Sequence, residues 1–196
     1  MGLSGALVAV SIGTIYGALA GFFGGKIDSL MMRFLEILNA FPFMFFVILL
    51  TTFFGRNLVL IFAAVGLVSW LDVARIVRGQ TLSLKHKEFV EAARVSSMSR
   101  RRIVVRHIIP NVLGVVMVYA SLLVPGMIMY ESFLSFLGLG VQEPMTSRGS
   151  MLQEGALTIE TAPWQLLVPS FFLVATLFCF NFLGDGLRDA LDPKDR

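Results

Sequence analysis

Long apolar runs alternate with short polar segments along this chain, and the pattern predicts five helices that cross a membrane. A crossing helix needs about 20 mostly apolar residues. The runs that reach this length are 3–23, 30–54, 58–77, 108–130 and 164–183. The second run contains Pro42 and the fourth Pro125, and either proline could mark a break. We therefore predict an all-α integral membrane protein, a polytopic helix bundle.

The placement of basic residues predicts the orientation of these helices. Segment 79–107 carries seven lysines and arginines, and the positive-inside rule assigns such a segment to the cytoplasm. Segment 141–163 has three glutamates against Arg148 and is then external, while the tail 184–196 is cytoplasmic. Counting back places Met1 outside, so we expect an amino-terminal helix to be missing from this chain.

Composition agrees with a lipid environment and argues against nucleic acid as a partner. Apolar residues make up 56% of the 196 positions and charged residues 15%, with a mean hydropathy of +0.80, whereas soluble domains carry roughly 25% charge. The net charge of +3 arises from basic residues beside the apolar runs. Cys179 is the single cysteine, and the two histidines lie at the basic segment, so we expect no metal site.

The sequence also lacks the signals of an enzyme. Gly24, Gly25 and Lys26 come nearest to a phosphate-binding loop, but Ala20 stands where that motif needs its first glycine, and Ile27 where it needs a hydroxyl residue. We therefore expect the chain to bind no cofactor and no ATP by itself.

Charged side chains inside the runs are read as structural ion pairs. Arg33 and Glu36 are three residues apart, as are Asp72 and Arg75, and this spacing brings side chains together on one helix face. Intramembrane acids are functional candidates by default. The ready arginine partner nevertheless favours a structural role for Asp72.

The basic segment contains a predicted amphipathic helix over 88–98 with a face of small residues. Ser99 could cap a second helix that leads toward the membrane. A lipid-surface helix is one interpretation. The small face favours another, a helix lying in a protein groove. At the other side of the membrane, we predict a short helix over 133–139 lying at the outer face.

The stretch EAARVSS, followed by RHIIP, resembles the EAA loop of permease subunits from bacterial binding-protein-dependent ABC importers. Glu91, Ala92, Ala93 and Pro110 stand in register with that motif. The chain departs from it with Ser97 in place of glycine, and with His107 and Ile109 at two apolar positions. Glycine at that position would let the chain turn between two helices. Serine makes the turn less easily.

The resemblance extends over nearly the whole chain. AGFFGGKIDSLMMR, YASLLVPGMIMYESFLSFLGLGVQEP and FCFNFLGDGLRDALDPKDR are similar to the peptide and nickel branch of the family. It implies a single type I ABC importer permease domain over 1–196, multi-pass in the bacterial inner membrane with its carboxyl terminus in the cytoplasm. It also implies six helices, one more than the apolar runs predict.

The family further implies a second permease subunit, two ATPase subunits that bind ATP and Mg, an external binding protein and a peptide cargo. The residues that we expect to dock the ATPases are Glu91, Ala92, Ala93, Arg94, Ser97, Arg100, Arg101, Arg102 and Pro110. For the three consecutive arginines, membrane topology and contact with anionic headgroups remain an equal alternative.

Three other functions remain open. The first is a secondary carrier driven by an ion gradient, and the second is a structural subunit without transport activity. The third is an importer of the same family for dipeptides or a nickel chelate, because apolar helices carry little information about the cargo. Abolition of uptake on ATP depletion would exclude an ion-gradient carrier.

Overall fold

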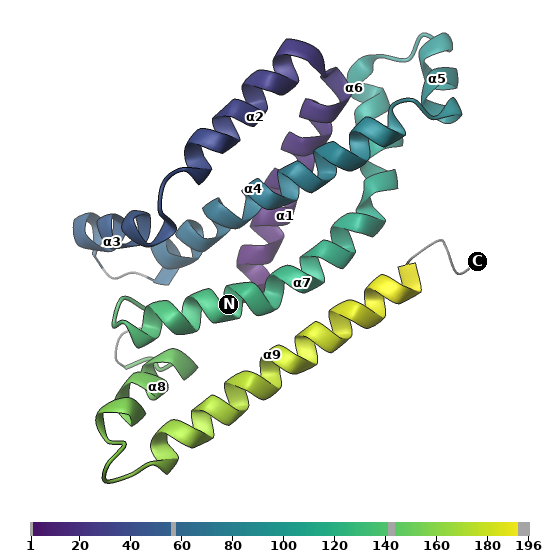
Figure 1. The fold of residues 1–196 in the computed structure, drawn as a ribbon. Helices are drawn as coiled ribbons and strands as arrows, with labels where there is room; N and C mark the ends of the chain where they lie inside the picture. Colours follow the sequence, from purple (N-terminus) through teal and green to yellow (C-terminus); the bar gives the residue numbers. More distant parts are fainter. Residues whose placement is uncertain (1, 56–57, 141–143, 192–196) are drawn as a thin grey trace.

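The computed structural model describes residues 2–55, 58–140 and 144–191, and every regular element in these ranges is a helix (Figure 1). The elements are α1 Gly2–Phe23, α2 Gly25–Asn39, α3 Phe43–Phe54, α4 Leu58–Leu84, α5 Glu88–Val95, α6 Arg100–Ile103, the π-helical segment η1 Val104–Ile108, α7 Ile109–Phe136, α8 Arg148–Leu157 and α9 Trp164–Leu191. The predicted all-α class is confirmed.

Three helical segments among the described residues are long and apolar enough to cross a membrane: 5–23, 100–136 and 164–190. The bent pair α2 and α3 would make a fourth if it forms one span. The remaining predicted run, 58–77, lies within α4, which continues to Leu84. The chain is therefore a multi-pass helical membrane protein, in which α9 runs beside α7 (Figure 1).

The predicted span over 30–54 is broken near Pro42, one of the two prolines at which the sequence allowed a break. The chain breaks between α2 and α3, and the two helices are bent by 71°. Pro42 stands at the amino-terminal cap of α3 with an extended backbone (φ −61°, ψ 118°). A proline removes a helical hydrogen bond and disfavours helical geometry at the residue before it, so the helix ends here.

Pro125, by contrast, leaves α7 continuous. Val124 and Met127 on either side of it are buried in a core with Ala9 and Trp70. Neighbouring helices hold this segment, and packing of this kind allows a proline inside a membrane helix.

Two predicted boundaries also change, because helices run further than the apolar runs. The expected separate helix over 133–139 is instead the last turn of α7, which ends only where Gly138 adopts a positive φ of 73°. Similarly, α9 continues beyond residue 183 to Leu191, so the first part of the expected tail is helical. Lys194 and Arg196 lie outside the described residues.

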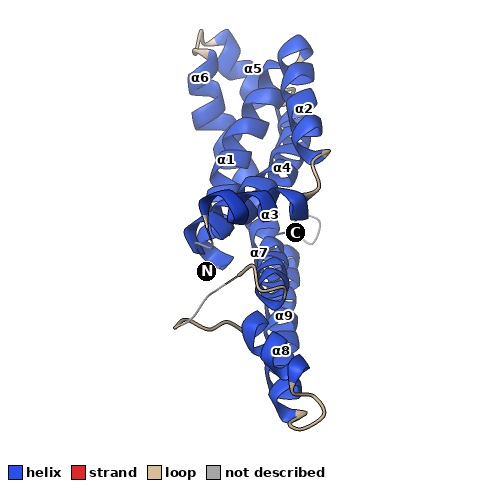
Figure 2. Ribbon diagram, turned by 90° about the vertical axis from the view of Figure 1, so that its left-hand side faces the viewer, coloured by secondary structure: helices blue, strands red, loops and turns tan. Residues whose placement is uncertain are grey.

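The predicted external segment 141–163 contains a helix that the sequence reasoning missed. Ser147 starts α8 with a reciprocal cap. The backbone N–H of Ser150 donates to the Ser147 Oγ, and the backbone N–H of Ser147 donates to the Ser150 Oγ. Gly149 and Gly155 let α8 lie against the backbones of α7 and α9. In Figure 2, α8 lies at one end of the molecule and α5 and α6 at the other.

The most extensive helix contact among the described residues is the crossing of α1 and α4. Gly13, Gly17 and Gly21 recur at four-residue spacing on the face of α1 that touches α4. A methyl group at Gly13 would lie 2.8 Å from the carbonyl oxygen of Trp70, and one at Gly21 would lie 2.8 Å from that of Arg78. The backbones approach closely because these positions carry no side chain, an arrangement typical of helices in lipid.

This crossing generates the first prediction. In the variant Gly17→Ala, the added methyl meets the Ala74 carbonyl oxygen. We expect overpacking to lower the free energy of unfolding by about 1 to 3 kcal/mol. The matched control is Gly114→Ala on α7, where a methyl meets nothing within 4 Å. Unfolding of the detergent-solubilised protein by increasing SDS, followed by circular dichroism, measures both. Equal midpoints for the two variants would show that the crossing has room for a side chain.

Candidate functional site

The candidate site is built around α5, which packs against the carboxyl end of α1 and against α6 and η1. Val90 is fully buried and Ala93 is 6% exposed. Both belong to a core cluster with Phe22 of α1, Ile103 of α6 and Ile108 of η1. The inner face of α5 is therefore held by the same chain that crosses the membrane.

The opposite face of α5 is exposed. Glu88, Glu91, Ala92 and Val95 follow one another at the spacing that places residues on one helix face. Val95 is 86% exposed, which is unusual for a valine and leaves an apolar side chain without cover in this chain. We call these four residues the outer face of α5. It is acidic at two positions and small or aliphatic at the other two.

Ala93 requires a correction. The sequence prediction placed it with Glu91 and Ala92 in the docking contact with a partner, but its methyl group is buried inside this chain. A small residue on an amphipathic helix fits either a partner or the helix's own bundle, and here the bundle takes it. Glu91, Ala92 and Arg94 are exposed, and their role in docking stays a prediction.

Ser97 makes the turn for which the motif uses glycine. Its φ is 57°, and it is the only non-glycine residue with positive φ in the described ranges. The N–H of Ser97 donates to the Arg94 carbonyl at 3.0 Å, and the N–H of Met98 donates to the Ala93 carbonyl at 3.2 Å. This pair of bonds is the Schellman arrangement at a helix end, and its left-handed position favours glycine.

The end of α7 has the same geometry with glycine. Gly138 has a φ of 73°, its N–H donates to the Ser135 carbonyl, and the N–H of Leu139 donates to the Leu134 carbonyl. This turn therefore occurs in the described residues once with a serine and once with a glycine. Serine adopts the conformation, but only under strain.

The second predicted helix merges with the membrane span. Ser99 occupies the amino-terminal cap position of α6, yet its side chain accepts no capping hydrogen bond. From Arg100 onward the helix is continuous to Phe136, interrupted only by the wider turn η1. Pro110 follows η1 at the start of α7. A proline ring clashes with the carbonyl four residues earlier in an α-helix, and a π-helical turn relieves such a clash.

Two cationic contacts tie the α5 region to α1. The guanidinium carbon of Arg94 lies 5.6 Å from the ring centroid of Phe22. The Nζ of Lys85, just beyond α4, donates to the Gly21 carbonyl at 3.1 Å, near the carboxyl end of α1 where backbone carbonyls are left free. Arg100, Arg101 and Arg102 are all exposed, so the structure leaves both interpretations of that cluster open.

The ion pairs fall partly where the sequence predicted them. Arg75 donates to Asp72 at 3.1 Å, as expected. Arg33 and Glu36 are exposed, and no ion pair joins them among the described side chains. A third pair was missed: Arg78 of α4 donates two hydrogen bonds, of 2.5 and 2.7 Å, to Asp28 of α2.

The Asp28–Arg78 pair closes the turn between α1 and α2. Gly24 and Gly25, with positive φ values of 65° and 57°, reverse the chain there. Asp28 then lies in the first turn of α2, where the helix dipole also favours an anion. Its side chain is 11% exposed and that of Arg78 is 33% exposed. The separation of fifty positions along the chain explains why spacing rules could not find the pair.

Together these features define a multi-pass helical membrane protein with a short helix, α5, held at one end of its bundle. In the described ranges, histidine, cysteine, aspartate and glutamate nowhere gather in a group of three that could hold a metal ion. The chain belongs to the family of binding-protein-dependent transport system inner membrane components, whose model matches residues 13–196.

Relatives within this family carry peptide-transport names. The oligopeptide transport system permease protein OppC of Haemophilus influenzae is 68% identical over 196 residues, all of this chain and 63% of the relative. OppC of Escherichia coli K12 is 73% identical over 173 residues, 88% of this chain and 57% of the relative. The dipeptide transport system permease protein DppC of Bacillus subtilis is 46% identical over all of this chain and 62% of its own length. This chain thus spans about three fifths of these relatives.

The turn at Ser97 gives the second prediction. Ser97→Gly removes the side chain from a left-handed position, so we expect the turn to gain roughly 1 kcal/mol. The reverse exchange, Gly138→Ser, should destabilise the end of α7 by a similar amount. Hydrogen exchange of the Met98 and Leu139 amides measures each turn separately. Unchanged protection in both variants would mean that neither turn depends on glycine.

The Asp28–Arg78 pair gives the third prediction. Asp28→Asn leaves the guanidinium of Arg78 without its charged partner, and we expect a loss of about 2 kcal/mol in unfolding free energy. Asp72→Asn is the matched control, because its pair with Arg75 is more exposed, at 58% and 37%, and should contribute less than about 1 kcal/mol. If Asp72→Asn lost more unfolding free energy than Asp28→Asn, the Asp72–Arg75 pair would be the more stabilising one, and the prediction would be wrong.

Proposed function

We propose that this chain is a membrane-spanning subunit of an ATP-driven importer and helps to form the translocation path for oligopeptides. The observation that carries the proposal is α5: its inner face is built into the bundle, while its outer face is left uncovered. Family membership supplies the class of transport, and the relatives named for oligopeptide transport share 68% and 73% identity, against 46% for the dipeptide relative.

The proposed partners follow from the same family. Two ATPase subunits would bind ATP and Mg and dock on the outer face of α5, so this chain would itself bind no cofactor and hydrolyse nothing. A second permease subunit would complete the path, and an external binding protein would deliver the peptide. The basic segment and the carboxyl terminus would then face the cytoplasm.

The contacts of α5 supply a physical route for coupling. A force on Glu91, Ala92 or Val95 reaches α6 and η1 through the buried Val90 and Ala93. It reaches α1 through the cation–π contact of Arg94 with Phe22. Since η1 continues directly into α7, movement of α5 would be transmitted to two helices of the bundle at once. A packed interface of this kind moves as a unit between discrete states.

Orientation is tested first. A reporter fused after Lys87 is expected in the cytoplasm, and one fused after Glu154 is expected outside, because basic loops are retained inside. The two sites lie in segments at opposite ends of the molecule (Figure 2). Matching locations for the two reporters would overturn the topology.

Docking is tested at the outer face of α5. Val95→Asp places a charge where we propose an apolar partner contact, and burying an unpaired charge there would lower ATPase affinity about tenfold or more. Peptide uptake and co-purification of the ATPases should both fall, while the amount of chain in the membrane stays normal.

The matched control is Leu157→Asp. Leu157 is the last residue of α8 as Val95 is of α5, and their exposures are 83% and 86%. Because α8 lies at the opposite end, this change should leave ATPase co-purification intact. Normal uptake and normal co-purification in Val95→Asp would reject docking at this face. Uptake that survives ATP depletion while an ion gradient is maintained would instead favour a secondary carrier.

A further inference from the structure

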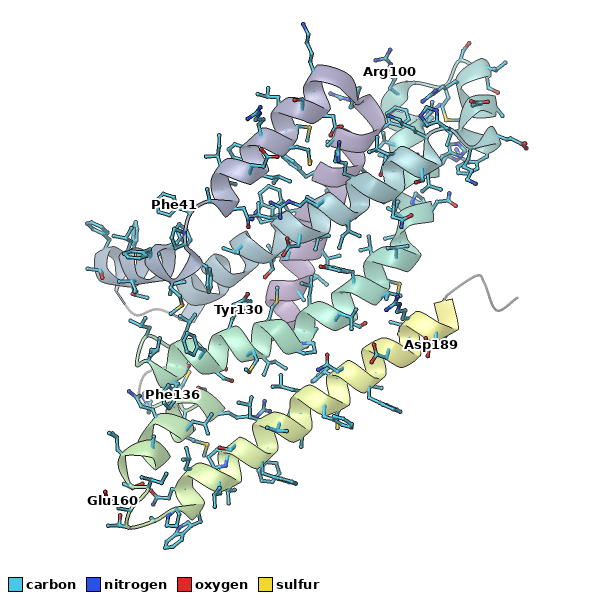
Figure 3. All side chains as sticks on the ribbon, in the orientation of Figure 1. Phe41, Arg100, Tyr130, Phe136, Glu160 and Asp189 are labelled. Carbon is cyan, nitrogen blue, oxygen red and sulfur yellow. The ribbon has the colours of Figure 1, made fainter. Side chains whose placement is uncertain are left out.

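A hollow of about 470 Å³ opens beside the carboxyl end of α1. Its lining comes from α1, α5, the turn after α5, and α6: Phe22, Phe23, Arg94, Met98, Arg100 and Ile103. Four of these residues are apolar and two are arginines. Figure 3 shows Arg100 at the end of the molecule opposite to Glu160, on the predicted cytoplasmic side. The hollow is thus amphipathic, with cations beside aromatic rings.

Its depth relative to the membrane follows from α1. Phe22 and Phe23 are the last residues of the apolar segment 5–23, which is long enough to cross the hydrocarbon core. The hollow therefore lies where hydrocarbon gives way to phospholipid headgroups. Arginines just beyond an apolar span meet the phosphates of the leaflet, and anionic lipids are attracted there.

The two guanidinium groups are available for a ligand. Arg94 and Arg100 are exposed, and neither forms an ion pair with an acidic side chain in the described ranges. The guanidinium carbon of Arg94 lies over the Phe22 ring, 5.6 Å from its centroid. A cation–π contact occupies no N–H group of the guanidinium, which can bind a phosphate through two parallel hydrogen bonds.

An apolar track leads from the hollow along α1. Val8, Ile12, Ile15, Leu19 and Phe23 recur at spacings of four, three, four and four, which places them on one helix face. Val8, Ile12, Ile15 and Phe23 are between 37% and 55% exposed, and Leu19 is partly buried. Phe23 belongs to both the hollow and the track, so an acyl chain could follow the helix from a headgroup held by the arginines.

We propose that this hollow binds one anionic phospholipid, with its phosphate between Arg94 and Arg100 and an acyl chain along the track on α1. A second basic hollow, lined by Ser99, Arg101, Arg102, Val105, Arg106 and Pro110, does not offer the same site. All of its lining comes from one helical run, so it has no opposing wall. The site ties a lipid to α5 and α1 together, whichever cargo the chain carries.

The experiment is native mass spectrometry of the protein purified from its own membrane with the subunits that it retains. Before ionisation it is exchanged into phosphatidylcholine nanodiscs with or without phosphatidylglycerol. We expect one phosphatidylglycerol to be retained by the wild type. In Arg94→Gln/Arg100→Gln the apparent affinity should fall roughly fivefold for each arginine removed, as for basic residues near an anionic surface.

Arg101→Gln/Arg102→Gln is the matched control, because it removes the same charge from the same segment outside the hollow. Retention that stays at the wild-type level in this control supports the site. An equal loss in both double variants would mean that net charge alone attracts the lipid, and would overturn the proposal. Absence of retained phosphatidylglycerol from the wild type would also overturn it, since a neighbouring subunit or another segment then covers the hollow.

Two further arms guard against trivial outcomes. Arg94→Lys keeps the charge but loses the paired N–H groups of the guanidinium, so it should weaken retention of phosphatidylglycerol. Unchanged hydrogen exchange of the Val90 amide would show that α5 stays in place in this variant. Glycerol 3-phosphate, which carries the headgroup chemistry without an acyl chain, should displace the lipid poorly. If glycerol 3-phosphate displaced the bound lipid as well as phosphatidylglycerol does, the track on α1 would contribute nothing to binding, and the lipid assignment would fail.

Discussion

The close approach of two backbones, α1 against α4, is the constraint on which the rest of the structure depends. In lipid there is no hydrophobic drive to bring apolar helices together, so contact area and fit must do it. Three glycines on α1 supply that fit, and the carbonyl groups of α4 fill the space that side chains would occupy. Because α1 is fixed in this way, Phe22 and the Gly21 carbonyl stand where Arg94 and Lys85 can reach them.

The position of α5 depends on that crossing, because α5 packs against the end of α1. The helix α5 has eight residues, too few to be stable alone in water. Its stability therefore comes from tertiary contacts: Val90 and Ala93 packed inside, and a closed turn at Ser97. The outer face of α5 contributes no side chain to this core cluster. A helix held by one face and open on the other suits a part that must receive a partner and pass its movement inward.

Sequence reasoning found the helical class, the family and the segment that holds the candidate site, because long apolar runs, charge asymmetry and a spaced motif are local signals. It placed Ala93 against a partner, since a small residue looks the same on either face until burial is known. It also could not choose between Pro42 and Pro125, because neighbouring helices decide whether a proline ends a helix. The Asp28–Arg78 pair and the α8 cap needed the fold, since they join distant or weakly marked residues.

The wider turn η1 also sets the rotational phase of the helix that follows it. Val104, Ile108, Val112 and Val116 are all buried, at a strict spacing of four. In an α-helix four residues overshoot a full turn by about 40°, so such a row would wind steadily around the axis. A π-helical turn holds more than four residues, so over η1 the row drifts the other way. The wide turn thereby offsets part of the α-helical drift, and the four residues stay in one core cluster from the α5 region into the membrane span.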